Sequence, residues 1–285
     1  MKSIATINFK GGAGKTTVTW LLAKYLVEKL GKKTLVVDID AQMCLTLAVQ
    51  LDQNKGVLNK DFDIWSHQND NQRSLTKVIE TFEKTKGDPL NFTFNSLIFK
   101  MSEKLHLIPS TIDMYWFDYD TNDKDKIKSF IQLFLKKLEK NSDYNYDYVL
   151  FDCPPYFNAL SYSVLSCASM VLIPVNPDIL AYKAIYLFIE GLTKRMKPLP
   201  NPKFSVFMNK AKILREHHLT TESNNYLNEV KKVKSNLEHI GVNINVFDSF
   251  IPERKDMNQG IPKGTIPADY EEYLKDIWLN IEKNL

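Results

Sequence analysis

Short apolar runs rich in β-branched residues alternate along the chain with longer amphipathic stretches, a pattern typical of βα units around a mostly parallel sheet. The runs predict strands at Lys2–Asn8, Thr34–Asp38, Leu105–Pro109, Tyr148–Asp152, Met170–Val175, Phe204–Asn209 and Asn245–Phe250. The amphipathic stretches predict helices at Lys15–Leu30, Ser74–Thr85, Lys124–Lys140, Ala159–Ser166, Ile179–Met196, Ser223–Ile240 and Pro267–Asn284. We therefore expect one α/β domain over residues 1–285, a doubly wound sheet flanked by helices. The polar, weakly periodic residues 52–70 are expected to form a surface excursion.

Composition narrows the class of protein. With 44% hydrophobic and 25% charged residues, the 285-residue chain is typical of a folded globular protein, and its net charge of +3 excludes a polycation. Cys44, Cys153 and Cys167 are odd in number and form no CxxC pair, which argues against a disulfide framework or structural zinc and predicts three buried thiols. No apolar run is long enough to cross a membrane, and the chain opens directly into a strand with no leader. The expected location is the cytoplasm.

A glycine-rich segment between the first strand and the first helix carries the strongest chemical signal. A strand, a glycine-rich turn and a helix N-terminus together aim backbone N–H groups and the positive end of the helix dipole at one point, which suits a polyphosphate. Glycines let the main chain approach closely, Lys15 supplies charge for the β and γ phosphates, and Thr16 can ligate Mg²⁺. Phe9 stands where the usual P-loop pattern has its first glycine. The predicted phosphate-binding residues are Lys10, Gly11, Gly12, Ala13, Gly14, Lys15, Thr16 and Thr17.

This loop, with its additional Lys10, resembles the deviant Walker A motif of the ParA/MinD family of P-loop ATPases. Residues 34–42, TLVVDIDAQ, resemble the second motif of that family, with Ala41 in the place of the usual proline. Residues 148–155, YVLFDCPP, are similar to its Walker B segment. The resemblance covers nearly the whole chain, and we expect a ParA-type member without the N-terminal DNA-binding extension that some relatives have.

Three aspartates follow strands whose carboxyl ends should meet at one edge of the sheet, where open α/β sheets bind ligands. Asp38, Asp40 and Asp152 can therefore face the phosphates, and their negative charge beside a polyanion implies Mg²⁺ between them, with Thr16 among its ligands. The resemblance implies that Asp40 orients the attacking water and that Asp152 is the Walker B acid. Lys10, Lys15 and Asp40 form the predicted catalytic set.

The family resemblance also implies how the chain uses ATP. Lys10 would reach across a face-to-face homodimer into the nucleotide of the neighbouring subunit, so that ATP joins the two subunits. Asn209 would present its amide to adenine, and the loop of residues 250–255, FIPERK, which includes Pro252, would close over the base. Residues 174–178 resemble the segment that rearranges when ATP binds.

Basic residues concentrate between Thr193 and Arg215, where seven cations occur in 23 residues without an Asp or Glu. Such a patch can neutralise DNA phosphates without reading base edges, and ParA-type proteins bind duplex DNA nonspecifically through a comparable stretch. The predicted DNA-binding residues are Lys194, Arg195, Lys197, Lys203, Lys210, Lys212 and Arg215.

The predicted function is an ATPase that associates with the nucleoid and positions a cargo, either a plasmid, a chromosome or a protein compartment such as a carboxysome. An adaptor protein would stimulate slow ATP hydrolysis and release the dimer from DNA. Two alternatives stay open: an amidoligase-like metabolic enzyme of the same superfamily, and a MinD-like placement factor on a membrane. The polar face of the C-terminal helix is acidic, which disfavours binding to an anionic membrane.

Overall fold

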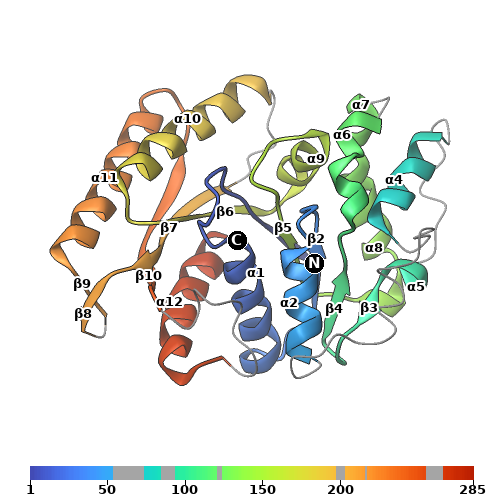
Figure 1. The fold of residues 1–285 in the computed structure, drawn as a ribbon, viewed down its shortest axis with the longest axis horizontal. Coiled ribbons are helices and arrows are strands. Elements are labelled where there is room, and N and C mark those ends of the chain that lie inside the picture. The colour runs from blue at the N-terminus through green and yellow to red at the C-terminus, as the bar shows by residue number, and fades with distance from the viewer. Residues whose placement is uncertain (54–73, 85–93, 121–123, 197–202, 216, 255–265) are drawn as a thin grey trace.

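A central eight-stranded sheet forms the framework of the protein in the computed structural model, which describes residues 1–53, 74–84, 94–120, 124–196, 203–215, 217–254 and 266–285. The strand order is β10-β7-β6-β1-β5-β2-β4-β3, with all neighbours parallel except the β3–β4 pair at one edge (Figure 1). The strands are β1 (Lys2–Thr6), β2 (Thr34–Asp38), β3 (Phe99–Lys100), β4 (Leu105–Ile108), β5 (Tyr148–Asp152), β6 (Met170–Val175), β7 (Lys203–Ala211) and β10 (Ile244–Pro252). A separate two-stranded ribbon pairs β8 (Ile213–Arg215) with β9 (His218–Leu219).

Helices cover both faces of the sheet, as the doubly wound class predicts. The longer ones are α1 (Lys15–Lys24), α2 (Cys44–Gln53), α4 (Leu75–Lys84), α8 (Phe130–Glu139), α9 (Ala159–Cys167), α10 (Ile179–Arg195), α11 (Thr221–Glu238) and α12 (Ala268–Asn284). The described residues also form shorter helical segments: α5 (Phe94–Leu97), α6 (Phe117–Asp120), α7 (Lys124–Ile127), the π-helical η1 (Tyr25–Lys29) and the 3₁₀ segments η2 (Ile112–Tyr115) and η3 (Ser142–Tyr144).

Alternation along the strands builds two cores, one on each face of the sheet. In β1, Ile4 packs with α1, α2 and α12, whereas its neighbour Ala5 packs with the helices of the opposite face. The same division holds in β5, where Leu150 and Phe151 belong to different cores. The strands are therefore buried on both sides, which explains why they read as nearly continuous apolar runs in the sequence.

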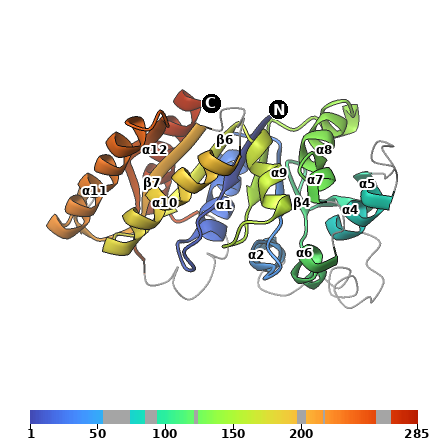
Figure 2. The same cartoon turned by 90° about the horizontal axis from the view of Figure 1, so that it is seen from above.

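The parallel arrangement brings the carboxyl ends of β1, β2, β5 and β6 to one edge of the sheet. The glycine-rich loop follows β1 there, and α2 begins just after β2 at the same edge (Figure 2). This edge holds every residue of the predicted nucleotide site.

Most predicted elements are confirmed to within a few residues, and the differences have local causes. The expected helix Lys124–Lys140 is divided into α7 and α8, because the backbone N–H and hydroxyl of Ser129 both donate to the Lys126 carbonyl, at 3.2 and 2.9 Å. The expected helix Lys15–Leu30 changes to a π-helical turn after Lys24, and Gly31 ends it with a φ of 62°.

The sequence prediction missed α2, the short β3 and the β8–β9 ribbon. The prediction of three buried thiols is wrong for two of them: all three cysteines are free, but Cys44 is exposed, Cys167 is partly exposed, and Cys153 alone is buried. Most of the expected excursion at residues 52–70 lies outside the described residues. Among the helices of the described part, none has the length and apolar character needed to cross a membrane.

Candidate nucleotide-binding site

The glycine-rich loop connects β1 to α1 and depends on glycine at specific points. Gly12 and Gly14 have φ values of 74° and 84°, in the left-handed region that favours glycine. Gly14 is the N-cap of α1 and offers no side-chain cap, so that the first N–H groups of the helix point into the loop without a side-chain acceptor. The loop therefore presents backbone donors at a helix N-terminus, as a phosphate site requires.

Side chains from distant strands hold this loop in place. Asn8 donates to the carbonyl of Pro174 at 2.8 Å and accepts from the backbone N–H of Lys10 at 2.8 Å. Asn176 donates to the carbonyl of Gly12 at 3.2 Å. The loop is thus fixed to the segment between β6 and α10.

Lys10 lies at the outer side of the loop and forms an ion pair with Asp178, which precedes α10. Both side chains are about one third exposed, at 37% and 36%. Lys15, in contrast, is only 8% exposed. Burial lowers the pKa of Lys15, while the nearby charges of Asp152 and Asp40 oppose that shift. The two lysines of the loop therefore have different environments: one is directed into the protomer, and the other remains accessible from outside.

Asp152 and Thr16 meet at the centre of the site. Thr16 Oγ1 donates to Asp152 Oδ2 at 2.6 Å, whereas Asp152 Oδ1 is buried without a hydrogen-bond partner. Burial and the adjacent Asp38 raise the pKa of Asp152 well above its usual value. A buried acceptor of this kind calls for a cation or for water bound to a cation.

Asp38 has a different environment from the one that the sequence suggested for a metal ligand. Its Oδ2 accepts hydrogen bonds from the backbone N–H and the hydroxyl of Thr46, at 2.8 and 2.7 Å, and its Oδ1 accepts one from the N–H of Asp40, at 3.0 Å. Burial raises the pKa of Asp38 to about 6, although these hydrogen bonds lower it. Both oxygens are thus engaged in holding the start of α2 and the Asp40 loop, through a contact with Thr46 that no sequence motif indicated.

The residues present fit Mg²⁺ that takes most of its ligands from water and phosphate. Within the described ranges, no group of three or more His, Cys, Asp or Glu side chains is placed to hold a metal ion. Mg²⁺ is usually bound through one or two protein groups together with substrate phosphates and waters. Thr16 and the unpartnered oxygen of Asp152 supply that limited set.

A pocket of about 190 Å³ adjoins the loop and contains both residues predicted to contact the base, Asn209 and Pro252. Asn209 Nδ2 donates to the carbonyl of Ala13 at 2.8 Å, so Asn209 also ties the loop to the end of β7. Arg254, from the segment expected to close over the base, also lines the pocket and lies 5.3 Å from the Tyr270 ring centroid. Sequence reasoning missed Tyr270, whose hydroxyl donates to the Pro252 carbonyl and which the contact of α12 with the end of β10 brings to the pocket.

Comparisons with known proteins show the family to which the chain is related. A family model described as an AAA domain matches residues 1–206. The chromosome-partitioning ATPase Soj from Treponema pallidum is 27% identical over 205 residues, which cover 72% of this chain and 68% of Soj. A replication protein of Sinorhizobium fredii is 28% identical over 209 residues, which cover 70% of this chain but 45% of the relative.

Solved structures share the fold over the full chain. A plasmid partition protein from Borrelia burgdorferi has a TM-score of 0.66 at 20% identity, with coverage of 100% of this chain and 99% of the other. Cobyrinic acid a,c-diamide synthase from Mycobacterium smegmatis, with a bound ATP analogue and magnesium, has a TM-score of 0.68 at 21% identity, with coverage of 100% and 97%.

The chain belongs to the ParA-type P-loop ATPases.

The fold of this ParA-type ATPase separates the basic residues that lie close together in the sequence between residues 194 and 215. Lys194 and Arg195 end α10, and Lys203 begins β7, whereas Lys210 and Lys212 lie at the opposite end of that strand. At about 3.3 Å per residue, β7 places the backbones of residues 203 and 210 roughly 23 Å apart. The expectation of one continuous patch is therefore wrong: two basic groups lie at opposite edges of the sheet.

The group at the carboxyl edge lies beside the nucleotide pocket. Lys210 lines that pocket, Lys212 pairs with Glu222 at 3.2 Å, and Arg215 is exposed on β8. At the other edge, Lys194 pairs with Glu190 at 2.8 Å and Arg195 is exposed. Lys197 lies outside the described residues.

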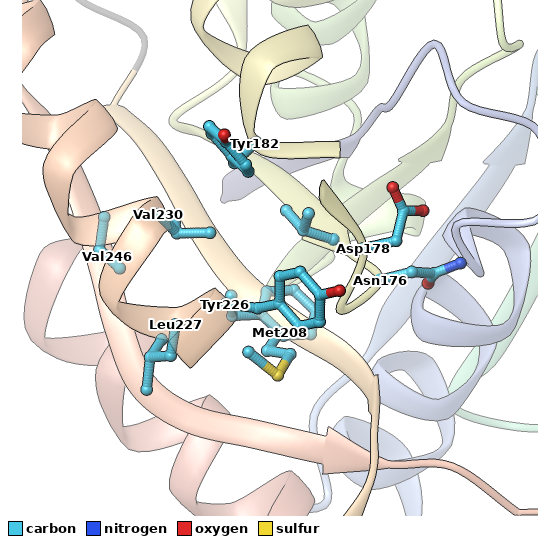
Figure 3. A pocket seen from close by; sticks show the side chains of 10 residues that line it. Asn176, Asp178, Tyr182, Met208, Tyr226, Leu227, Val230 and Val246 are labelled. Atoms are coloured by element: carbon cyan, nitrogen blue, oxygen red, sulfur yellow. The ribbon is translucent and has the colours of Figure 1, made fainter. Parts of the chain in front are cut away.

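A second, small pocket lies between β6, β7, α10 and α11, with Asn176 and Asp178 among its lining residues (Figure 3). Its cavity volume of about 10 Å³ is room for roughly one water molecule. Its walls are mostly apolar, including Val230 and Leu227. In this ParA-type ATPase the pocket is too small for a substrate. Asp178, the ion-pair partner of Lys10, therefore lies next to the packed residues of α10 and α11.

Proposed function

We propose that this chain is a Mg²⁺-dependent ATPase that dimerises when ATP is bound, binds duplex DNA without sequence specificity in that state, and positions a cargo with the help of an adaptor protein. The observation that carries the proposal is the arrangement of the two loop lysines. Lys15 is buried beside Asp152, while Lys10 is about one third exposed and its ammonium pairs with Asp178 at the surface. An exposed ammonium beside a phosphate site suits a second nucleotide on a twofold-related subunit.

The residues of one protomer divide the work of phosphoryl transfer. The backbone N–H groups of the loop and the Lys15 ammonium bind and orient the β and γ phosphates. Asp40, fixed by its N–H bond to Asp38, orients the attacking water. Mg²⁺, when bound, would neutralise charge on the phosphates beside Asp152. Lys10 of each subunit would stabilise the charge that develops on the nucleotide of the other.

Sedimentation tests the dimer directly. With ATP and Mg²⁺ the wild-type chain should sediment as a dimer and with ADP as a monomer, and Lys10→Ala should remain a monomer in both. Asp40→Ala should form a dimer that persists because hydrolysis is blocked. A Lys10→Ala dimer as stable as the wild-type dimer would contradict the role given to Lys10.

We assign DNA binding to the basic group at the carboxyl edge, because among the described residues of the basic stretch this group adjoins the nucleotide pocket. A mobility shift should appear with ATP, not with ADP, should be independent of DNA sequence and should weaken steeply with salt. Lys212→Ala/Arg215→Ala should lose the shift, whereas Arg195→Ala, an exposed cation at the opposite edge, serves as the control. ATP hydrolysis without any DNA shift would instead favour the amidoligase-like alternative, for which the diamide synthase fold is a precedent at the level of fold.

The proposed location is the cytoplasm, on the nucleoid. The adaptor protein would determine the cargo, which is either DNA or a protein compartment.

A further inference from the structure

An exposed aromatic surface lies beyond the end of β4, outside the nucleotide site. It consists of Ile112, Tyr115, Trp116 and Tyr119, which are 60%, 51%, 62% and 86% exposed. We call these four residues the aromatic surface. Their side chains form no ring contact, hydrogen bond or ion pair with the other described residues. Four large exposed side chains within eight residues are uncommon on a monomer and are typical of a binding site.

The backbone beneath this surface is well defined. Met114 and Phe117, only 2% and 6% exposed, anchor the segment in the core. Backbone hydrogen bonds join Met114 to Thr111 and Trp116 to Asp113, both at 3.0 Å. The buried anchors thus alternate with the outward-facing residues, so that η2 and α6 present the aromatic surface on a fixed scaffold.

Charge decides which partner fits. Residues 111–120 contain three Asp and no Lys or Arg, in a chain whose net charge is +3. Asp113 is exposed between Ile112 and Tyr115. DNA and anionic lipid would be repelled by this segment, and self-pairing across a twofold axis would bring like charges together. A protein segment with basic and apolar side chains is complementary on both counts.

A short chain of hydrogen bonds connects the aromatic surface to the nucleotide site. Thr46 Oγ1 donates to Asp38 Oδ2 at 2.7 Å and accepts from the backbone N–H of Ser110 at 2.9 Å. Ser110 comes two residues before Ile112, and Asp38 binds the N–H of Asp40. The buried hydroxyl of Thr46 therefore links Ser110, at the base of the aromatic surface, to Asp38, which in turn holds the backbone of Asp40. Figure 2 shows α2, which carries Thr46, and α6 along the same side of the molecule.

We propose that the aromatic surface docks a basic, apolar segment of a partner protein, and that docking is sensed at Asp38 through Thr46. The proposal rests on the proposed function only in identifying that partner with the adaptor.

Binding can be tested with labelled probe peptides of defined chemistry: an amphipathic Lys/Leu peptide, a Lys/Ser peptide of equal charge, and a Glu/Leu peptide. Fluorescence anisotropy should show that the Lys/Leu peptide binds the full chain, that the Lys/Ser peptide binds at least about tenfold more weakly, and that the Glu/Leu peptide does not bind. Trp116→Ser/Tyr119→Ser should weaken Lys/Leu binding about tenfold or more. Leu187→Ser, at a 65% exposed position on α10, is the matched control and should bind like wild type.

Equal binding of the Lys/Leu peptide to wild type and the double variant would overturn the proposal. So would loss of the ATP-dependent dimer in the double variant with unchanged peptide binding, since a second copy would then be the occupant. Failure of the proposed function would give a different result: wild type with ATP would form no dimer in sedimentation and would give no DNA mobility shift, whether or not the peptide binds.

The connection to Asp38 has its own measurement. The Lys/Leu affinity of wild type should differ at least about threefold between the ATPγS-bound and ADP-bound chain, and Thr46→Val should remove the difference while still binding the peptide. Identical affinities in the two nucleotide states of wild type would refute the connection.

Discussion

The three glycines of the phosphate loop should differ sharply in their tolerance of a methyl group, and Gly14 should be the most sensitive. Its φ of 84° lies in the left-handed region, which costs a residue with a Cβ roughly 1–2 kcal/mol. A Cβ at Gly14 would also meet Asn209 Nδ2 at 2.2 Å. Asn209 would have to move and lose its bond to Ala13, at a further cost of about 1–2 kcal/mol. We therefore expect Gly14→Ala to lower the free energy of unfolding by about 2–4 kcal/mol.

Substitutions at Gly12 and Gly11 separate the cost of the left-handed backbone from the cost of the close contact with Asn209. Gly12 shares the left-handed conformation, with a φ of 74°, but a Cβ there would meet nothing within 4 Å, so that Gly12→Ala should cost only the roughly 1–2 kcal/mol of backbone strain. Gly11 has neither constraint, and Gly11→Ala should change the free energy of unfolding by less than about 0.5 kcal/mol. Urea unfolding of the nucleotide-free chain measures all three.

A double-mutant cycle tests the close contact itself. Asn209→Ala removes the atom that a Cβ at Gly14 would meet, so Gly14→Ala/Asn209→Ala should be about 1 kcal/mol more stable than the two single effects predict. Strict additivity, or a Gly11→Ala variant as unstable as Gly14→Ala, would refute the geometry described for the loop.

Three further predictions concern the charged groups of the site. Thr16→Val removes the hydroxyl that donates to Asp152, and calorimetry should show ATP affinity in Mg²⁺ falling about tenfold with affinity in EDTA unchanged; an equal loss in both would argue against a role at the cation. Burial raises the pKa of Asp38 from 3.8 to about 6, so the stability that Asp38 contributes to the nucleotide-free chain is present below pH 4 and lost as pH rises toward 6. The free energy of unfolding in urea should therefore fall across this window for wild type relative to Asp38→Asn. Parallel pH profiles of the two proteins would contradict this prediction. Asp178→Asn removes the ion pair with Lys10 but keeps a side-chain oxygen for the N–H of Leu180 at the start of α10. The dissociation constant of the ATP-dependent dimer, measured by sedimentation, should fall up to about fivefold, which corresponds to the energy expected for a partly exposed ion pair. A weaker dimer would show that Asp178 assists Lys10 instead.

The sequence by itself determined the class of fold and the chemistry of the phosphate loop, because both depend on residues close together in the chain. Continuous apolar runs identify strands buried on both faces, and a strand, glycines and a helix in succession define a phosphate cradle wherever they occur. The positions of Lys15, Thr16 and Asp152 at one edge of the sheet followed from the parallel order alone, and the structure brings Thr16 and Asp152 into contact.

Tertiary structure decided the contacts between residues that lie far apart in the sequence. The Thr46 hydroxyl reaches Asp38 because α2 packs beside β2, and Tyr270 reaches Pro252 because α12 packs beside β10, contacts that no local pattern encodes. The basic residues between 194 and 215 form one run in the sequence, yet an extended strand carries them to opposite edges of the sheet. Sequence order fixes the local geometry of each turn and helix, but neighbours in the folded protein are selected by the packing of apolar faces, which is a property of the whole chain.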